Sequence, residues 1–285
     1  MTPSTARLLI YCPDRRGIIA AVTGFIARHS GNILDLDQHT DPQAREFFMR
    51  LEIDRKGFNL NEGTFAEAWS PIAADYDMRW HAYWGDRVKR MVILVSREGH
   101  CLNDLLWRQR TGELPVEIPF VVGNHPDLER DTAALGVTFH HVPVAPDAKE
   151  QAEARLGDLL RDANVDFIVL ARYMQILSPE FVARFQERII NIHHSFLPAF
   201  AGSKPYHQAY DRGVKLIGAT SHYVTERLDD GPIIAQATHP VDHRDTIDEM
   251  IRAGRDLERV VLARAVRLHV EDKILVSKNK TVVFA

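Results

Sequence analysis

Two neighbouring segments carry an amide, an imidazole and a carboxylate at positions that could act on one small polar group. Asn191 and His193 lie in the apolar run Ile189–His193, which predicts a short buried strand ending in a polar tip. Side chains alternate along a strand and rise about 3.3 Å per residue, so these two face the same side, roughly 6.6 Å apart. A neighbouring strand and turn could bring Asp229 to the same place. Ligands of open α/β sheets bind at the carboxyl ends of the strands, where this pair would lie.

Each of these side chains suits a step of acyl chemistry. Asn191 is a neutral donor that cannot ionise, which suits an oxyanion hole. His193 can donate a hydrogen bond or move a proton near neutral pH, and Asp229 can accept a proton from water or fix the tautomer of a histidine. A lone Asn-x-His at a strand end is more often a capping pair or a satisfied polar edge. Asp230 follows directly, and chemistry alone does not choose between the two carboxylates.

The elements that must position these residues predict two domains. Residues 6–86 predict a small βαββαβ unit, because strand-like runs alternate with two stretches of apolar residues at helical spacing. Residues 85–90 form a polar linker, so we expect domains at 1–86 and 87–285. Beyond the linker, continuous Val/Ile/Leu runs separated by helices predict a mainly parallel, Rossmann-like sheet covered on both faces. These runs are residues 91–95, 118–122, 137–142, 167–170, 189–193 and 216–224.

The clearest helices of the second domain are residues 147–163 and 179–186, followed by a long helical tail segment, 246–270. Apolar residues form a stripe along that segment. Beyond it, residues 273–284 predict a hairpin that turns at Asn279.

Composition excludes several classes of protein. The 285 residues have 45% hydrophobic and 26% charged content, which is typical of a soluble globular protein. A formal net charge of -4 argues against binding nucleic acid through overall charge. The N-terminus lacks the apolar core of a signal peptide, and no apolar run approaches the ~18 residues that span a bilayer. We therefore expect a cytoplasmic protein with neither nucleic-acid nor membrane partners.

The 14 histidines require a metal site to be considered. Two adjacent pairs, His193 with His194 and His140 with His141, lie in strand-like runs, where neighbours point to opposite faces and chelate poorly. The two cysteines form neither a disulfide framework nor a metal cluster. Cys101 lies near a helix start that could acidify its thiol, but packing is the favoured role. We expect no metal and no cofactor.

The segments around Asn191 resemble the active-site region of the formyltetrahydrofolate-dependent formyltransferase family. The matching pieces are Asn191-Ile192-His193-His194-Ser195-Phe196-Leu197-Pro198-Ala199-Phe200, then Gly218-Ala219-Thr220-Ser221-His222-Tyr223-Val224, then Asp229 shortly before Gly231. The resemblance selects Asp229 over Asp230. It implies that Asn191 and His193 steady an oxyanion while Asp229 orients and deprotonates water. It also implies substrate contacts from the pterin-pocket segment and the second strand, at Met174, Gln175, Ile176, Leu177, His222 and Val224.

The turn at residues 96–105 distinguishes between branches of this family. In the glycinamide ribonucleotide transformylases a glycine-rich loop here cradles the phosphate of the acceptor. Here Arg97, Glu98, His100 and Cys101 replace most of that loop, and Glu98 would repel a phosphate. This turn and the loop at 202–207 are similar to those of the deformylases.

That resemblance implies hydrolysis of 10-formyltetrahydrofolate to formate and tetrahydrofolate, which feeds formate to one-carbon and purine metabolism. Formyl transfer to an amine acceptor is the nearest alternative. A regulatory protein that binds a folate or an amino acid without turnover is another.

Residues 6–86 resemble an ACT domain, a ferredoxin-like module that often senses amino acids. The resemblance rests on Cys12-Pro13-Asp14-Arg15-Arg16-Gly17-Ile18, on Ser30-Gly31-Asn32-Ile33-Leu34, and on Phe47-Phe48-Met49-Arg50. It implies either an effector, methionine or glycine, held by its carboxylate at the helix N-terminus near Gly17, or contacts between subunits alone. We expect a homo-oligomer, a dimer or a tetramer.

Overall fold

The fold is described from a computed structural model of the chain. It covers residues 5–85, 87–145, 148–198 and 205–285. Phe200, the loop at 202–204 and the first residue of the helix expected at 147–163 lie outside the described residues. Two compact units are present, and each is described by itself. The first comprises Met1–Val88, Glu271–Ser277 and Val282–Ala285, and the second comprises Lys89–Val270 and Lys278–Thr281.

The first unit is an antiparallel sheet with two helices packed on one face. Its strand order is β2-β3-β1-β4. Its elements in chain order are β1 (Thr5–Pro13), α1 (Ile18–Arg28), β2 (Asn32–Asp41), β3 (Glu46–Asp54), α2 (Glu62–Asp75) and β4 (Arg79–Trp84). Leu8 and Ile10 of β1 share a core with Phe25 of α1 and Trp69 of α2. The predicted ferredoxin-like βαββαβ arrangement is therefore confirmed.

Most of the C-terminal tail, Glu271–Ser277 and Val282–Ala285, groups with this first unit, whereas Lys278–Thr281 groups with the second. The sequence prediction placed the whole tail in the domain of residues 87–285. The hairpin consists of β13 (Ile274–Ser277) and β14 (Lys280–Val283). Side chains alternate across a sheet, so Leu9 and Phe48 point away from the two helices. They pack instead with Leu275 and Phe284 from the tail. The tail thus covers apolar side chains on the second face of the sheet.

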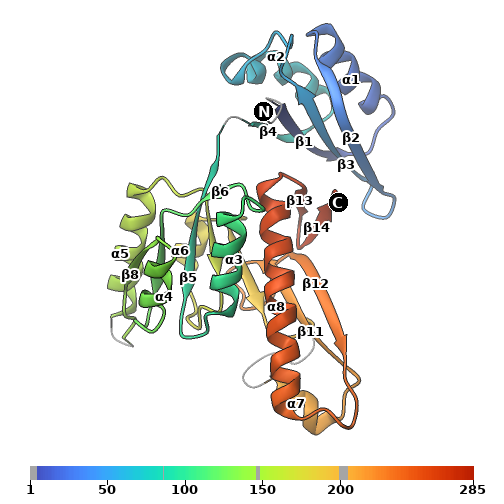
Figure 1. Cartoon of the computed structure of the whole chain (residues 1–285). Coiled ribbons are helices and arrows are strands. Elements are labelled where there is room, and N and C mark those ends of the chain that lie inside the picture. Colours follow the sequence, from blue (N-terminus) through green and yellow to red (C-terminus); the bar gives the residue numbers. More distant parts are fainter. Residues whose placement is uncertain (1–4, 86, 146–147, 199–204) are drawn as a thin grey trace. The chain divides into compact units, whose positions relative to one another are not determined.

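The second unit holds a mixed sheet with the strand order β12-β11-β10-β9-β5-β7-β8 (Figure 1). Strands β10, β9, β5, β7 and β8 run parallel, whereas β11 and β12 are antiparallel additions at one edge. The predicted mainly parallel α/β sheet is therefore confirmed. The strands are β5 (Lys89–Val95), β6 (Val116–Glu117), β7 (Phe120–Gly123), β8 (Thr138–His141), β9 (Phe167–Leu170), β10 (Ile189–His193), β11 (Leu216–Tyr223) and β12 (Ile233–Pro240).

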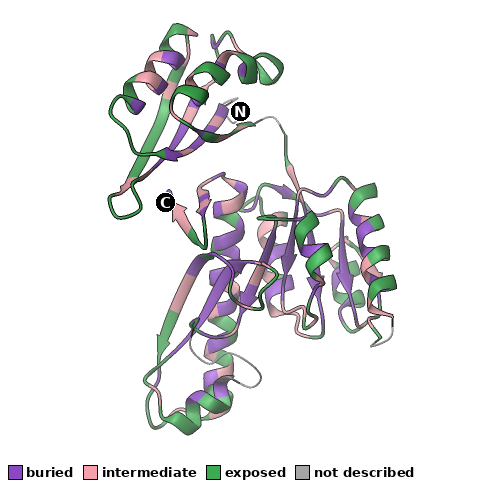
Figure 2. Ribbon diagram, turned by 180° about the vertical axis from the view of Figure 1, so that it is seen from behind, coloured by how far each residue is buried: buried purple, intermediate pink, exposed green. Residues whose placement is uncertain are grey.

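Helices cover this sheet and make its central strands the core of the unit. They are α3 (His100–Arg110), α4 (Glu129–Ala134), α5 (Lys149–Asp162), α6 (Pro179–Arg184), α7 (Pro205–Arg212) and α8 (Ile247–Val270). Leu156 and Leu160 of α5 pack with Val92 of β5 and Ile168 of β9. Figure 2 shows the central strands as buried, which explains why their apolar runs are continuous. Within the described part of the chain, no helix combines the length and apolar character needed to cross a membrane.

Candidate active site

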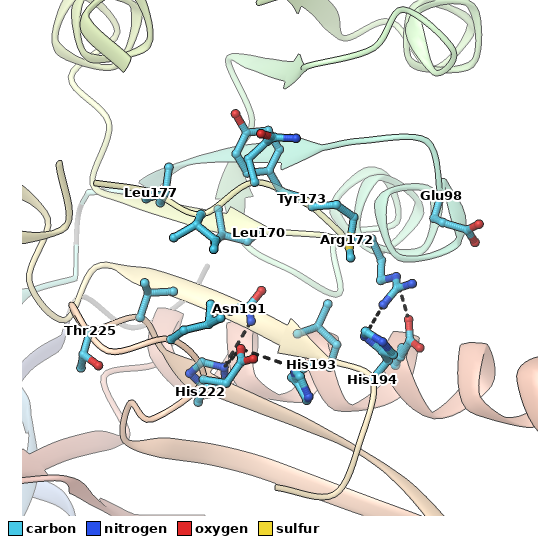
Figure 3. A pocket seen from close by; sticks show the side chains of 18 of the residues that line it. Glu98, Leu170, Arg172, Tyr173, Leu177, Asn191, His193, His194, His222 and Thr225 are labelled. Atoms are coloured by element: carbon cyan, nitrogen blue, oxygen red, sulfur yellow. Dashed lines mark hydrogen bonds and ion pairs between the residues drawn. The ribbon is translucent and has the colours of Figure 1, made fainter. Parts of the chain in front are cut away.

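A cavity of about 580 Å³ opens at the carboxyl ends of β9 and β10 in the second unit. Its lining differs from one end to the other. Figure 3 shows Leu170 and Leu177 at one end, Arg172, His194 and Glu98 at the other, and Asn191, His193 and His222 between them. An apolar slot and a polar chamber therefore meet at the predicted catalytic residues.

The three predicted catalytic side chains converge on this middle region. Asn191 and His193 come from β10, and Asp229 comes from the turn between β11 and β12. The Oδ1 atom of Asp229 lies 3.3 Å from Nδ1 of His193 and 3.8 Å from Nε2 of His222. Asn191 places its Nδ2 atom 3.2 Å from the same Nε2 of His222. A single contact network therefore includes all three residues and His222.

The register of β10 against β11 makes this network possible. Asn191 lies opposite His222, and His193 lies opposite Thr220. The register in which β11 pairs with β12 shifts between Ser221 and His222 of β11. Bulges of this kind re-aim a side chain. The bulge lies at the strand position whose imidazole reaches both Asn191 and Asp229.

The surroundings of His222 fix its tautomer. Its Nδ1 atom lies 2.9 Å from the backbone carbonyl of Tyr223, an oxygen that can only accept, so Nδ1 carries the proton. Burial lowers the pKa of His222, so the ring is neutral near neutral pH and its Nε2 accepts from Asn191. The Asn191 amide is thereby held with one N–H on His222. Its second N–H remains available for a substrate oxygen.

Asp229 is a carboxylate at neutral pH. The hydrogen bond from His193 lowers the pKa of Asp229, and the nearby histidine charges lower it further, against the opposing effect of partial burial. A carboxylate with a low pKa is a weak base. As a carboxylate it can accept hydrogen bonds, and it accepts one from His193.

A constrained turn presents Asp229. Its backbone has a φ of 53°, in the left-handed region that non-glycine residues rarely adopt. The turn passes so close to β11 that a Cβ on Gly231 would lie 1.7 Å from the carbonyl oxygen of Tyr223. The N–H of Tyr223 donates to the carbonyl of Pro232 at 2.9 Å. Positive-φ residues concentrate at functional sites, where the surrounding structure enforces them.

The two ring nitrogens of His193 differ in their contacts. Its Nδ1 faces Asp229, while its Nε2 is buried without a hydrogen-bond partner among the described residues. Buried polar atoms without a partner are uncommon in folded proteins. This nitrogen is the one available to a substrate.

The predicted substrate-binding residues all line the cavity. They are Met174, Gln175, Ile176, Leu177, His222 and Val224. The segment is tied to the sheet at Met174, whose N–H donates to Oγ of Ser96 at 2.9 Å. Met174 and Ile176 are 59% and 62% exposed, so they offer apolar surface to a ligand. His222 differs from the others, because both of its ring nitrogens contact protein atoms.

The expectation that His193 and His194 face opposite sides is wrong. Their ring centroids lie 5.2 Å apart with an interplanar angle of 27°. Strand β10 ends at His193, so the alternation of a strand no longer governs His194. Nδ1 of His194 instead accepts a hydrogen bond from Arg172 at 2.6 Å.

Sequence reasoning missed Glu258, a buried carboxylate in the wall of the cavity. Glu258 belongs to α8 and is 1% exposed. The sequence did contain a signal for its burial. The buried stripe of α8 has a four-residue spacing that includes Gly254, Glu258 and Leu262. A charge inside an apolar stripe indicates a buried polar partner, since charged residues are almost never fully buried unpaired.

In the part of the chain that the structure describes, one group of possible metal ligands is found, at His100, Cys101 and Glu258, whose ligand atoms lie within 4.8 Å of one another. Its chemistry fits a cation poorly. Arg172 places Nε 3.5 Å from the Glu258 carboxylate, so this carboxylate already faces a positive charge. Burial and the Glu258 charge raise the pKa of the Cys101 thiol. A protonated thiol is neither a good ligand nor a nucleophile.

Comparisons with known proteins define the class. Residues 89–266 match the formyl transferase family, and residues 6–60 match the ACT domain. The chain is therefore an ACT-domain enzyme with the formyl transferase fold. It resembles the glycinamide ribonucleotide transformylase 1 structure from Symbiobacterium toebii with a TM-score of 0.66 and 31% identity, over 71% of this chain and 97% of that chain.

Similarity to deformylases extends over the whole length. The chain is 50% identical over 281 residues to the formyltetrahydrofolate deformylase of Synechocystis sp., covering 99% of each. It superposes on the crystal structure of a formyltetrahydrofolate deformylase from Pseudomonas syringae pv. tomato with a TM-score of 0.97 and 49% identity, over 100% of this chain and 96% of that one. The chain belongs to the formyltetrahydrofolate deformylase family.

Proposed function

We propose that this chain hydrolyses 10-formyltetrahydrofolate to formate and tetrahydrofolate, with Asn191, His193 and Asp229 as its catalytic residues. The observation that carries the proposal is the 3.3 Å approach of Asp229 to His193 beside a cavity of about 580 Å³. Ligand sites of this kind measure ~300–1,000 Å³ and combine apolar walls with a few placed polar groups. Family membership supports the same activity.

The apolar end of the cavity suits the pterin ring. Leu170, Leu177 and Val182 form part of one packed cluster, with Val224 against it. Ile176 adds exposed apolar surface. A flat heterocycle placed here would direct the formyl group, carried beside the ring, toward Asn191 and His193.

In the proposed reaction, the oxygen of a water molecule bonds to the formyl carbon, and the formyl oxygen takes up negative charge. The second N–H of Asn191 and the free Nε2 of His193, when protonated, donate to that oxygen. Asp229 accepts a hydrogen bond from the water and orients it. The water becomes strongly acidic only as the new C–O bond forms, and the Asp229–His193 pair then takes its proton. The bond from carbon to nitrogen breaks, the proton passes to the departing nitrogen, and formate leaves.

These steps require no cofactor, because side chains supply every donor and acceptor. We therefore propose that the folate is the substrate and that no redox or metal group takes part.

We also propose that an amino-acid effector, either methionine or glycine, binds to the ACT domain in the first unit. Helix α1 follows Gly17, whose φ of 91° turns the chain sharply into the helix. No described side chain caps this N-terminus, so its backbone N–H groups could receive a carboxylate. We also propose a homo-oligomer, a dimer or tetramer, supported by exposed Leu34 and Leu36 on the edge strand β2.

Formate release without an added amine tests the main proposal. Purified protein is mixed with 10-formyltetrahydrofolate, and formate and tetrahydrofolate are measured together. Equal amounts of both products are expected. Turnover that begins only when an amine acceptor is supplied would instead identify a transferase.

A further inference from the structure

The polar chamber of the cavity is the side from which the acceptor of the formyl group must arrive. The apolar slot around Leu170 and Leu177 lies on one side of Asn191 and His193, and Arg172 and His194 lie on the other (Figure 3). When the folate fills the slot, the chamber is the remaining approach to the formyl carbon. The residues of the chamber therefore decide which acceptor enters.

Glu258 is the centre of the chamber. Its carboxylate lies 2.7 Å from Nε2 of His100, 3.0 Å from the hydroxyl of Tyr206 and 3.5 Å from Nε of Arg172. Burial opposes its ionisation, but the hydrogen bond from His100 and the Arg172 charge still hold the pKa of Glu258 below its usual range. A buried charge persists only where partners of this kind surround it.

Among the described residues, Arg172 and Arg255 are the arginines at this end of the cavity, and each faces a carboxylate. Arg172 pairs with Glu258 and donates from NH1 to His194 at 2.6 Å. Burial and the Arg172 charge lower the pKa of His194 to about 4, so this ring is a neutral acceptor near neutral pH. At the other edge, NH2 of Arg255 lies 2.9 Å from the Glu98 carboxylate. The four charged groups cancel in pairs, which leaves little attraction for an anionic ligand.

The backbone of α8 is adapted to this arrangement. A Cβ on Gly254 would lie 2.0 Å from the Tyr206 hydroxyl and 2.3 Å from its ring. Only a glycine leaves room for Tyr206 to reach Glu258, one helical turn further along. Arg172 also has a backbone φ of 63°, a conformation that needs support from its surroundings.

We propose that this network, centred on Glu258, selects water as the acceptor by neutralising Arg172 and Arg255. The inference rests on the proposed hydrolysis. An amine acceptor that carries a phosphate or carboxylate would need a cation to hold it, and Arg172 and Arg255 are already paired with carboxylates. Water needs no such anchor. Glu258 is thus a positioning residue that acts through Arg172, Tyr206 and His100.

The test replaces Glu258→Gln, which keeps the shape of the side chain and removes its charge. Turnover of 10-formyltetrahydrofolate is measured with inorganic phosphate as an inhibitor, and separately with O-phosphoethanolamine as an amine that carries a phosphate. Arg172 then faces the chamber without a neutralising carboxylate. We expect inhibition by phosphate to strengthen on the order of tenfold, and the ratio of N-formyl product to formate to rise by a similar factor.

A second variant, Glu98→Gln, releases Arg255 at a half-exposed position, where misfolding is not expected. It should shift phosphate inhibition in the same direction. Asp256→Asn is the matched control, because Asp256 is an exposed carboxylate on the same helix that pairs with Arg259. It should leave both readouts at the wild-type value.

The product ratio and phosphate inhibition do not depend on how much of a variant is folded. If wild-type protein releases formate but both variants keep the wild-type ratio and phosphate response, the network proposal is wrong and the hydrolysis stands. If wild-type protein releases no formate without an amine, the proposed function itself fails.

Discussion

Asp229 and His193 meet at 3.3 Å, although they come from a turn and from a strand separated by α7 and β11. The contact joins the Oδ1 atom of Asp229 to Nδ1 of His193, so the imidazole donates there and its Nε2 is left without a partner among the described residues. Ionised Asp229 thereby stabilises positive charge on the ring. The same carboxylate can hold a water molecule beside the formyl carbon.

We predict that Asp229→Asn suppresses formate release by about 10²–10⁴-fold, the range for a positioned proton-transfer group. The amide keeps the size of the side chain but cannot take a proton or stabilise a charged His193. Because the pterin slot is unchanged, tetrahydrofolate should bind with nearly wild-type affinity. Single-turnover formate release and calorimetric folate binding measure the two quantities. Formate release at the wild-type rate would remove Asp229 from the mechanism.

Asp230→Asn is the matched control for this substitution. Its carboxylate is the next residue along the chain, its side chain is 56% exposed and it pairs with Arg227 at 3.7 Å. Among the described ion pairs, His193 contacts Asp229, whereas Asp230 contacts Arg227. Activity should stay within about twofold of wild type, since surface substitutions usually change free energies by no more than about 0.5 kcal/mol.

Asn191→Ala is expected to lower kcat by about 10²–10³-fold, the usual effect of losing one oxyanion donor. The amide is held by His222, and in the proposed reaction its remaining N–H donates to the formyl oxygen. A transition-state donor affects kcat much more than KM. A variant that raises KM alone would show that Asn191 binds the ground state of the substrate.

Much of the fold follows from local patterns in the sequence. Strands β5, β9 and β10 are continuous apolar runs, because both of their faces are covered. Strand β12 was not predicted, since its second half, from Gln236, is polar and largely exposed at the edge of the sheet. The attachment of the tail to the first unit was also missed. It depends on contacts of Leu275 and Phe284 with residues far away in the chain.

The candidate site, too, could be predicted only in part from the sequence. Asn191 and His193 could be placed together because strand periodicity fixes their common face, and the resemblance supplied Asp229. Glu258 could not be placed, because its partners come from α3, α7 and the segment after β9. The contact of His194 with Arg172 depends on where β10 ends, which periodicity does not define.

Gly231→Ala is expected to abolish most of the activity while leaving the first unit intact. The added Cβ would collide with the carbonyl of Tyr223, so the turn that presents Asp229 must move. A displacement of about 1 Å at a catalytic group can lower a rate by about 10²-fold. Formate release measures the effect, and far-ultraviolet circular dichroism checks the fold. Gly24→Ala is the control, because that glycine lies within α1 without a left-handed φ and its added Cβ would meet only the end of the Arg28 side chain, at 3.4 Å. Unchanged activity in Gly231→Ala would show that the close approach does not position Asp229.

His269 should make the second unit less stable in mild acid. Burial and the Lys89 charge lower the pKa of His269 to about 3, from an ordinary value of 6.5. A lowered folded-state pKa means that its contribution to stability is complete above pH 6.5 and is lost as the pH falls toward 3. Each pH unit in that window removes up to about 1.4 kcal/mol. His269→Gln keeps a polar partner for the hydroxyl of Tyr223, at 2.8 Å from Nδ1 in the wild type, but does not titrate. Denaturant unfolding between pH 7 and 4 should therefore give a shallower slope for the variant, and parallel slopes would contradict this assignment.

The ACT domain should respond to methionine or to glycine. An effector at 100 times its Kd stabilises the folded state that binds it by about 2.7 kcal/mol, which a thermal melt of the whole protein detects. Gly17→Ala should remove the response, because the φ of 91° at this position is strained for alanine and the new Cβ would lie 3.1 Å from the Tyr76 hydroxyl. Gly57→Ala is the matched control, since Gly57 also has a left-handed φ of 86° but lies away from the start of α1. If neither amino acid changes the melting temperature or the formate release of the wild-type protein, the effector proposal is wrong. Contacts between subunits would then be the remaining role proposed for this domain.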